Sequence, residues 1–209
     1  GTPHMEIDGV NRLRVTTNRV LPDGIGFVSV RVASVVTKGR IRVTVCDPDR
    51  LTAVLEKLEE AGAKVTTGED WIEVDGTGEH QAVDIRTAPY PGFPTDMQAQ
   101  FMALNTTAEG ASHVAETIFE NRFMHVHELQ RLGADITIDG NNAVVRGVER
   151  RSGAPLVATD LRASAALVIA ALTADGESTV DRIYHLGRGY EKMEQKLSSL
   201  GAKIKRVKA

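Results

Sequence analysis

The sequence has 209 residues, of which 42% are hydrophobic, 25% charged and 4% aromatic, with one cysteine and a formal charge of -3. This composition is typical of a globular protein and excludes collagen, low-complexity disorder and a disulfide scaffold. Because acidic and basic residues nearly balance, the chain has no general attraction to nucleic acid or to anionic membranes, and neither is expected as a partner.

Residues 1–5 look like a cloning remnant that ends in a methionine, and residues 6–209 are predicted to form a single domain. Nothing near the N-terminus resembles a signal peptide, and no apolar stretch approaches the ~20 residues that span a bilayer. Cys46 has no second cysteine with which to form an internal disulfide. These features predict a cytoplasmic protein.

The first patterned stretch, residues 27–36, alternates in polarity and is rich in β-branched side chains, which predicts a strand. A helix is predicted next, over residues 51–61, because its apolar residues recur at helical spacing up to Gly62. The same pattern returns before Gly133 and Gly201, at intervals of 71 and 68 residues. A glycine can adopt the left-handed conformation that ends a helix, so each copy is predicted as a helix followed by a strand.

A second, more apolar helix is predicted before each of the last two glycine-terminated helices, over residues 95–104 and 159–172. Thr95 and Gln98 form a predicted capping box, and Thr159 is predicted to cap the other helix. Further strands are predicted over residues 71–74, 136–138 and 143–146. The chain is therefore predicted to be α/β, or α+β in some schemes, with three βαβαββ units over residues 6–85, 86–148 and 149–209.

Four motifs lie in the last 124 residues: residues 86–100, 116–126, 159–164 and 181–191. Their central sequences are Phe-Pro-Thr-Asp-Met-Gln, Thr-Ile-Phe-Glu-Asn-Arg, Thr-Asp-Leu-Arg-Ala-Ser and His-Leu-Gly-Arg-Gly-Tyr. In this order and spacing they closely resemble the UDP-N-acetylglucosamine enolpyruvyl transferases, also called 1-carboxyvinyltransferases. The resemblance extends from about residue 6 to the C-terminus.

The resemblance implies a cytoplasmic bacterial transferase that needs no cofactor. Such enzymes move the enolpyruvyl group of phosphoenolpyruvate to the 3′-hydroxyl of UDP-N-acetylglucosamine and release phosphate. The reaction belongs to peptidoglycan synthesis, and so to cell-wall biogenesis, cell shape, the cell cycle and cell division. The implied fold is one inside-out barrel domain of three βαβαββ units, with helices in the centre and sheets outside.

The resemblance also implies that a second domain is missing. Family members are about twice as long, and their N-terminal half carries a Lys-Asn pair for phosphoenolpyruvate and a mobile loop with a reactive cysteine. Cys46 does not match that loop and is expected to be a buried or edge thiol. The chain is therefore expected to be the C-terminal domain, to need the N-terminal domain as a partner and to lack turnover alone. Residues 24–34 and Gly187 depart from the family pattern, through either drift or deliberate change.

Two acidic residues and two arginines are carried over as catalytic candidates. Asp96 resembles the aspartate that contacts the sugar hydroxyl and is proposed as the base, although an acid is also common in the first turn of a helix. Arg162 and Arg188 match arginines near the phosphoenolpyruvate carboxylate, which a planar guanidinium can bind bidentately. Asp160 either orients these arginines or supports the helix end, and the sequence favours neither role.

Two further observations concern binding. Ile118 and Phe119 match the segment that lines the UDP-sugar site, although an apolar pair is more often part of a core. His125 and His127 are two residues apart, as in a metal pair on a strand, but no third ligand converges on them, so no metal site is predicted.

Two alternatives to this function remain. The chain could be a stand-alone folding or interaction domain that binds no ligand, and self-association is possible under either hypothesis. It could also come from the related enolpyruvyl transferase of the shikimate pathway, which the motifs disfavour because they follow the UDP-sugar branch. Titration with UDP-N-acetylglucosamine distinguishes a retained half-site from a stand-alone domain that binds no ligand.

Overall fold

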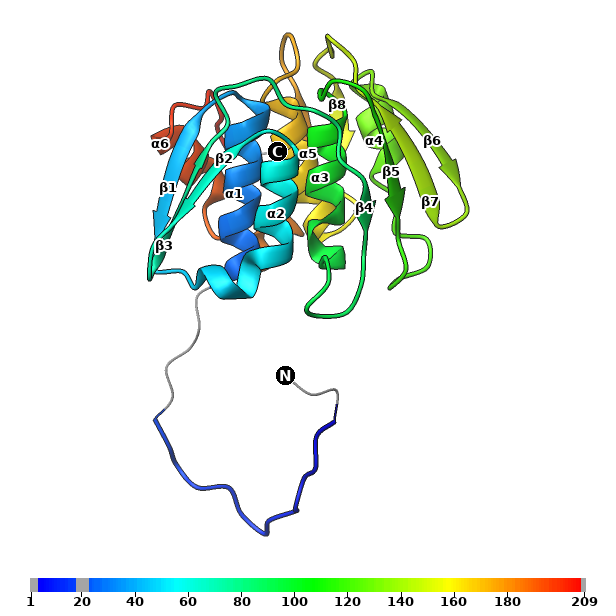
Figure 1. Cartoon of the computed structure of the whole chain (residues 1–209). Helices are drawn as coiled ribbons and strands as arrows, with labels where there is room; N and C mark the ends of the chain where they lie inside the picture. Colours follow the sequence, from blue (N-terminus) through cyan, green and yellow to red (C-terminus); the bar gives the residue numbers. More distant parts are fainter. Residues whose placement is uncertain (1–3, 18–22, 208–209) are drawn as a thin grey trace.

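The computed structural model describes residues 4–17 and 23–207 and places three helices inside a shell of β-sheets (Figure 1). The central helices are α1 (Gly24–Val36), α3 (Gln98–Asn105) and α5 (Leu161–Ala171), and each contacts the other two. Every residue of α3 is buried. This mixed α/β arrangement, with helices inside and sheets outside, confirms the predicted fold class.

The outer shell consists of three sheets, which do not join into a closed barrel within the described residues. The first sheet has the strand order β1 (Arg40–Thr44), β3 (Trp71–Asp75) and β2 (Lys64–Thr67). The second sheet has the order β4 (Ile85–Arg86), β5 (Ala111–Ala115), β7 (Asn142–Arg146) and β6 (Asp135–Asp139). The third sheet consists of β8 (Pro155–Val157) and β9 (Thr179–Asp181). The pairs β4–β5 and β8–β9 are parallel, and the others are antiparallel.

Three outer helices end at the predicted glycines: α2 (Thr52–Glu60), α4 (Val126–Arg131) and α6 (Met193–Ser199). Gly62, Gly133 and Gly201 have φ angles of 97°, 98° and 100°. In each case the glycine N–H bonds to the carbonyl three residues earlier, and the next N–H bonds to the carbonyl five residues earlier. This is the Schellman helix ending, in which a residue with a side chain would be strained.

The strand predicted over residues 27–36 is wrong, because these residues lie in α1. Val28, Val32 and Val35 are fully buried at helical spacing, and Asp23 caps the helix through a hydrogen bond from the N–H of Ile25 (3.1 Å). Because α1 lies in the centre of the domain and is buried on several sides, its sequence shows no clear amphipathic stripe. Tertiary burial outweighs the β propensity of its valines.

Both cap predictions are wrong in detail. Thr95 is the first residue of a short 3-10 helix, η2 (Thr95–Met97), and makes no cap hydrogen bond, because its hydroxyl donates to Glu116 instead. In α5 the cap is Asp160, whose carboxylate accepts from two backbone N–H groups. A charged carboxylate one residue closer to the helix is the stronger acceptor, so it replaces Thr159.

Several remaining segments complete the description. Short 3-10 helices occur at η1 (Pro48–Leu51) and η3 (Leu186–Arg188). Cys46 is buried, as predicted. The strand expected after Gly201 is absent, since residues 202–207 have no strand in the structure. Residues 4–17 also lack helix and strand and are exposed (Figure 1). Among the described residues, no helix combines the length and apolar character needed to cross a membrane.

Candidate active site

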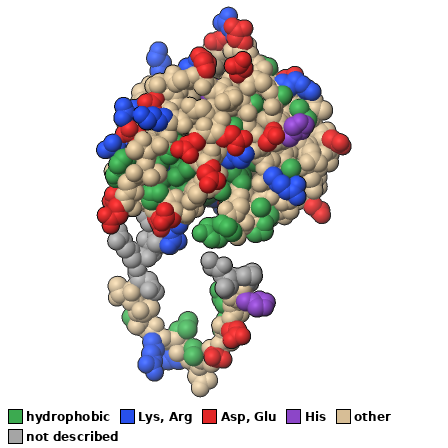
Figure 2. All heavy atoms as spheres, viewed as in Figure 1, with side chains coloured by type: hydrophobic (Ala, Val, Ile, Leu, Met, Phe, Trp, Pro, Cys, Tyr) green, Lys and Arg blue, Asp and Glu red, His purple; other side chains and the backbone are tan. Residues whose placement is uncertain are grey.

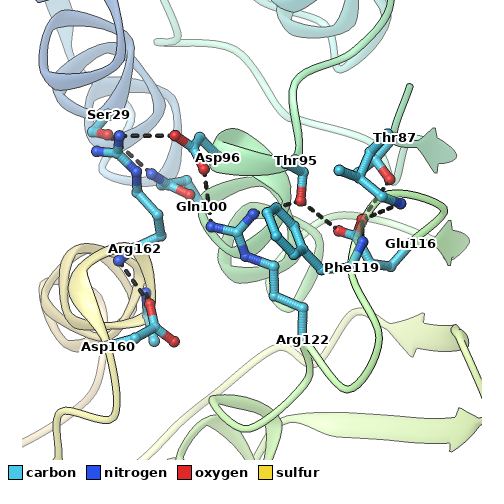
Figure 3. Close-up of polar contacts among 12 residues, drawn as sticks. Ser29, Thr87, Thr95, Asp96, Gln100, Glu116, Phe119, Arg122, Asp160 and Arg162 are labelled. Carbon is cyan, nitrogen blue, oxygen red and sulfur yellow. Dashed lines mark hydrogen bonds and ion pairs between the residues drawn. The ribbon is translucent and has the colours of Figure 1, made fainter. Parts of the chain in front are cut away.

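The carboxylate of Asp96 lies between two guanidinium groups that come from different parts of the chain (Figure 3). Arg122 Nη2 donates to Oδ1 and Arg162 Nη2 donates to Oδ2, each at 2.9 Å. Burial would raise the pKa of Asp96, but the hydrogen bonds from Arg162 and Arg122 outweigh it and lower the pKa below its ordinary value. Asp96 is thus ionised at neutral pH, and 36% of its side chain remains exposed.

The backbone at Arg162 is fixed by the cap of α5. Its backbone N–H, together with that of Ala163, donates to Asp160 Oδ1 at 2.8 and 2.9 Å, which fixes the start of α5. Asp160 makes no ion pair with Arg162 or Arg188, so of its two predicted roles the structure shows support of the helix end. Because Arg162 lies in the first turn of α5, the cap also fixes the position of its Cα atom.

A buried polar network lies behind the guanidinium of Arg162. Arg162 Nη1 is 3.4 Å from the hydroxyl of Tyr190, which in turn is 3.1 Å from Ser29 Oγ. Gln100 Nε2 donates to both oxygens, at 3.1 and 3.2 Å. The network joins α1, α3 and α5, so the position of Arg162 depends on the packing of the three central helices.

Glu116 is a buried carboxylate that connects three segments around the site. Its Oε1 accepts hydrogen bonds from Thr87 Oγ1 (2.8 Å) and from the backbone N–H groups of Ile118 and Phe119 (2.9 and 3.2 Å). Its Oε2 accepts from Thr95 Oγ1 at 2.8 Å. Glu116 therefore holds the residue before Asp96 and the turn after β5 in one arrangement (Figure 3).

Sequence reasoning did not select Glu116 or Arg122 as site residues, although both lie in the second motif. Arg122 also donates to Thr95 Oγ1 at 2.6 Å, so the Thr95 hydroxyl connects the two residues. Both are charged residues inside a motif, and this signal could have identified them as candidate site residues. The side chains to which they are hydrogen-bonded, however, lie 21 to 29 residues away in the chain, and only the fold brings them together.

An apolar pocket opens beside Asp96. Ile118 and Phe119 line it and are 37% and 52% exposed, so the alternative that they form part of a core is wrong. The Phe119 ring also lies 4.8 Å from the guanidinium carbon of Arg122, a cation–π contact. The complete lining comprises Ile25, Ala88, Pro89, Tyr90, Pro94, Thr95, Asp96, Ile118 and Phe119. Asp96 is thus the only charged residue in a mostly hydrophobic wall.

The remaining candidates lie apart from this cluster. Arg188, in η3, is exposed, and no hydrogen bond or ion pair joins it to Asp96 or Arg162. His127 is exposed, whereas His125 is buried, and burial lowers the pKa of His125 to about 4. Within residues 4–17 and 23–207 no group of three histidine, cysteine or acidic side chains is placed to hold a metal.

Comparison with known proteins identifies relatives. The family model of EPSP synthase (3-phosphoshikimate 1-carboxyvinyltransferase) matches residues 1–197. The enolpyruvyl transferase NikO from Streptomyces tendae is 33% identical, with a TM-score of 0.81 over 89% of this chain and 44% of that one. EPSP synthase from Acinetobacter baumannii, at 16% identity and a TM-score of 0.54, shares the fold over 73% of this chain and 38% of its own. The chain thus spans less than half the length of either protein.

Proposed function

Because the chain belongs to the EPSP synthase family of carboxyvinyl, or enolpyruvyl, transferases, we propose that it supplies half of an enolpyruvyl transfer site. The donor is phosphoenolpyruvate and the acceptor is the 3′-hydroxyl of UDP-N-acetylglucosamine, in the cytoplasmic synthesis of peptidoglycan. The observation that carries this proposal is the ionised carboxylate of Asp96, held between Arg122 and Arg162 at the edge of an apolar pocket.

Enolpyruvyl transfer adds an alcohol across the double bond of phosphoenolpyruvate and then expels phosphate. The reaction needs a base for the hydroxyl, an acid for the methylene carbon, and cations for the carboxylate and phosphate. Asp96 is ionised and partly exposed, so it can accept the proton of the sugar hydroxyl. Arg162 provides a guanidinium within reach of the same point, and Arg188 is proposed to join it when the site is complete.

The lining of the pocket favours a sugar hydroxyl as the group beside Asp96. Among the lining residues Asp96 is the only charged one, and the walls around it are formed by Pro94, Tyr90 and Phe119. A phosphate monoester placed in this pocket would meet the Asp96 carboxylate, and Arg122 or Arg162 would have to leave that carboxylate to bind it. A neutral sugar ring with its hydroxyl directed at Asp96 fits this charge distribution better. Ile118 and Phe119 are proposed to contact the same substrate.

We expect the chain alone to release phosphate from phosphoenolpyruvate and UDP-N-acetylglucosamine only at the background rate. The described site has no unpaired cation aimed at a phosphate leaving group, so the complementary domain is needed for the reaction. A coupled phosphate assay measures this directly. Activity should appear when the N-terminal half of an enolpyruvyl transferase is added in trans, and sustained turnover by the chain alone would contradict the proposal.

Asp96→Ala is expected to weaken binding of UDP-N-acetylglucosamine by at least tenfold, because the sugar hydroxyl loses a charged acceptor worth roughly 1.5–3 kcal/mol. Isothermal titration calorimetry with the isolated chain measures the change. Asp139→Ala is the matched control, since Asp139 is an exposed aspartate at the end of β6 and should leave affinity unchanged.

A second candidate acceptor is 3-phosphoshikimate, because the matching family model carries that name. The same titration decides between the two. Saturable binding of 3-phosphoshikimate and not of the UDP-sugar would transfer the proposal to the shikimate pathway. Failure to bind either ligand would favour a stand-alone folding or interaction domain, with possible self-association.

A further inference from the structure

The third sheet lacks a strand that the second sheet has. In the second sheet the order is β4-β5-β7-β6, so β7 lies between β5 and β6. The parallel pair β8–β9 repeats the pair β4–β5, because in each pair a central helix, α5 or α3, connects the two strands. Gly110 and Gly176, with φ angles of 98° and 92°, precede β5 and β9. Within the described residues no strand pairs with the other edge of β9.

Residues 203–207 correspond to β6 but are not in a sheet. They follow Gly201-Ala202 just as β6 follows Gly133-Ala134, which places Ile204 at the position of the buried Ile136. In the second sheet this strand pairs with β7, and no other described strand pairs with its far edge. The third sheet therefore lacks the strand equivalent to β7, which would pair with both β9 and residues 203–207.

Residues 5–9 carry the pattern of β3 and β7. Each of those strands is followed by a glycine, Gly76 or Gly147, and has buried apolar side chains two and four residues before it. The four buried residues are Ile72, Val74, Ala143 and Val145. Before Gly9 the equivalent positions hold Ile7 and Met5, which are 81% and 83% exposed. Figure 2 shows the described N-terminal segment extending away from the rest of the molecule.

The charges on the two unpaired segments are complementary. In the register between β6 and β7, Asp135 faces Arg146 and Thr137 faces Val144. The same register pairs Lys203 with Asp8 and Lys205 with Glu6, and it sets Ile204 opposite Ile7. Opposite charges and apolar pairs directly across an antiparallel ladder stabilise the pairing of the two strands.

We infer that residues 5–8 insert as a strand between β9 and residues 203–207 of the same chain, completing a four-stranded third sheet. The insertion buries Met5 and Ile7, pairs the free edge of β9 and brings residues 203–207 into the sheet. Fourteen residues, 9–22, separate this segment from Asp23 and can span about 45 Å, enough to cross a domain of about 200 residues.

Hydrogen exchange measured by mass spectrometry tests this insertion on the unmodified chain. Backbone amides of residues 5–9 and 203–207 are expected to exchange at least tenfold more slowly than those of residues 11–17. Exchange of both segments at the rate of an unstructured chain would overturn the inference. Protection found only in a dimer, by size-exclusion chromatography with light scattering, would also overturn it, because the strand would then come from a second copy.

Ile7→Asp provides an independent test, because it places a charge at an inward position of the new strand. We expect it to remove the protection of residues 203–207 and to lower the Tm by about 5 °C or more. Val15→Asp is the matched control, since Val15 is exposed in the same segment but lies outside the proposed strand. Equal behaviour of the two variants would contradict the insertion.

Discussion

Glu116→Ala is expected to lower the free energy of unfolding by about 3 kcal/mol, because four hydrogen-bond donors lose a buried, charged acceptor. Glu116 is 2% exposed, so water cannot fully replace the carboxylate. For a domain of this size the loss corresponds to a fall in Tm of about 6–12 °C. Urea denaturation followed by circular dichroism measures it.

Two further variants at and near this position separate the role of the carboxylate from a general effect on the loop. Glu116→Gln keeps an oxygen that can accept from the backbone N–H groups of Ile118 and Phe119. It should therefore lower the free energy of unfolding by only about half as much as Glu116→Ala. Glu120→Ala removes an exposed carboxylate four residues along the same loop and should change the free energy of unfolding by less than about 0.5 kcal/mol. A loss below 1 kcal/mol for Glu116→Ala would show that the four donors find other partners.

Stability is expected to fall as the pH is lowered from 7 to 5, by about 2 kcal/mol from His125 alone. Burial lowers the pKa of His125 to about 4, against about 6.5 in the unfolded chain. Between these two values the unfolded chain binds more protons than the folded one, so acid favours unfolding. Asp160 raises the pKa of His125 and Arg122 lowers it, but burial is the dominant cause.

The pH effect can be assigned to one residue by comparing two histidine variants. His125→Phe removes the titrating group and should flatten the dependence of the free energy of unfolding on pH between 7 and 5, whatever its effect at pH 7. His113→Gln, in the exposed part of β5, should keep the full slope. An unchanged slope in His125→Phe would mean that another group causes the acid sensitivity.

The elements that the sequence predicted well are those with local signals. Gly62, Gly133 and Gly201 end their helices where a left-handed residue is needed, and this requirement can be read without knowing the fold. Helix α1 could not be recognised in this way, because a helix buried on several sides lacks the amphipathic pattern that identifies one. The cap at Thr95 failed for a similar reason, since its hydroxyl is used by Glu116 from another segment.

The candidate site shows the same division between local and long-range information. The motifs selected Asp96 and Arg162, which the fold joins across 66 residues of sequence. Arg122 and Glu116 were overlooked, because a charged side chain becomes part of a site only through the partners that the fold supplies. Arg188 was selected with the same reasoning as Arg162, yet no contact brings it to Asp96. Its role stays a prediction.

Because Asp96 is paired with two arginines, its pKa depends on whether those arginines also bind another anion. A carboxylate that accepts from both guanidinium groups is a weak proton acceptor, and an anion that draws Arg162 away would make it a stronger one. This linkage is reciprocal, so protonation of Asp96 must in turn strengthen the hold of Arg162 and Arg122 on that anion. Under the proposed function, this linkage would let an anionic substrate that binds Arg162 prepare Asp96 to accept a proton from the other substrate.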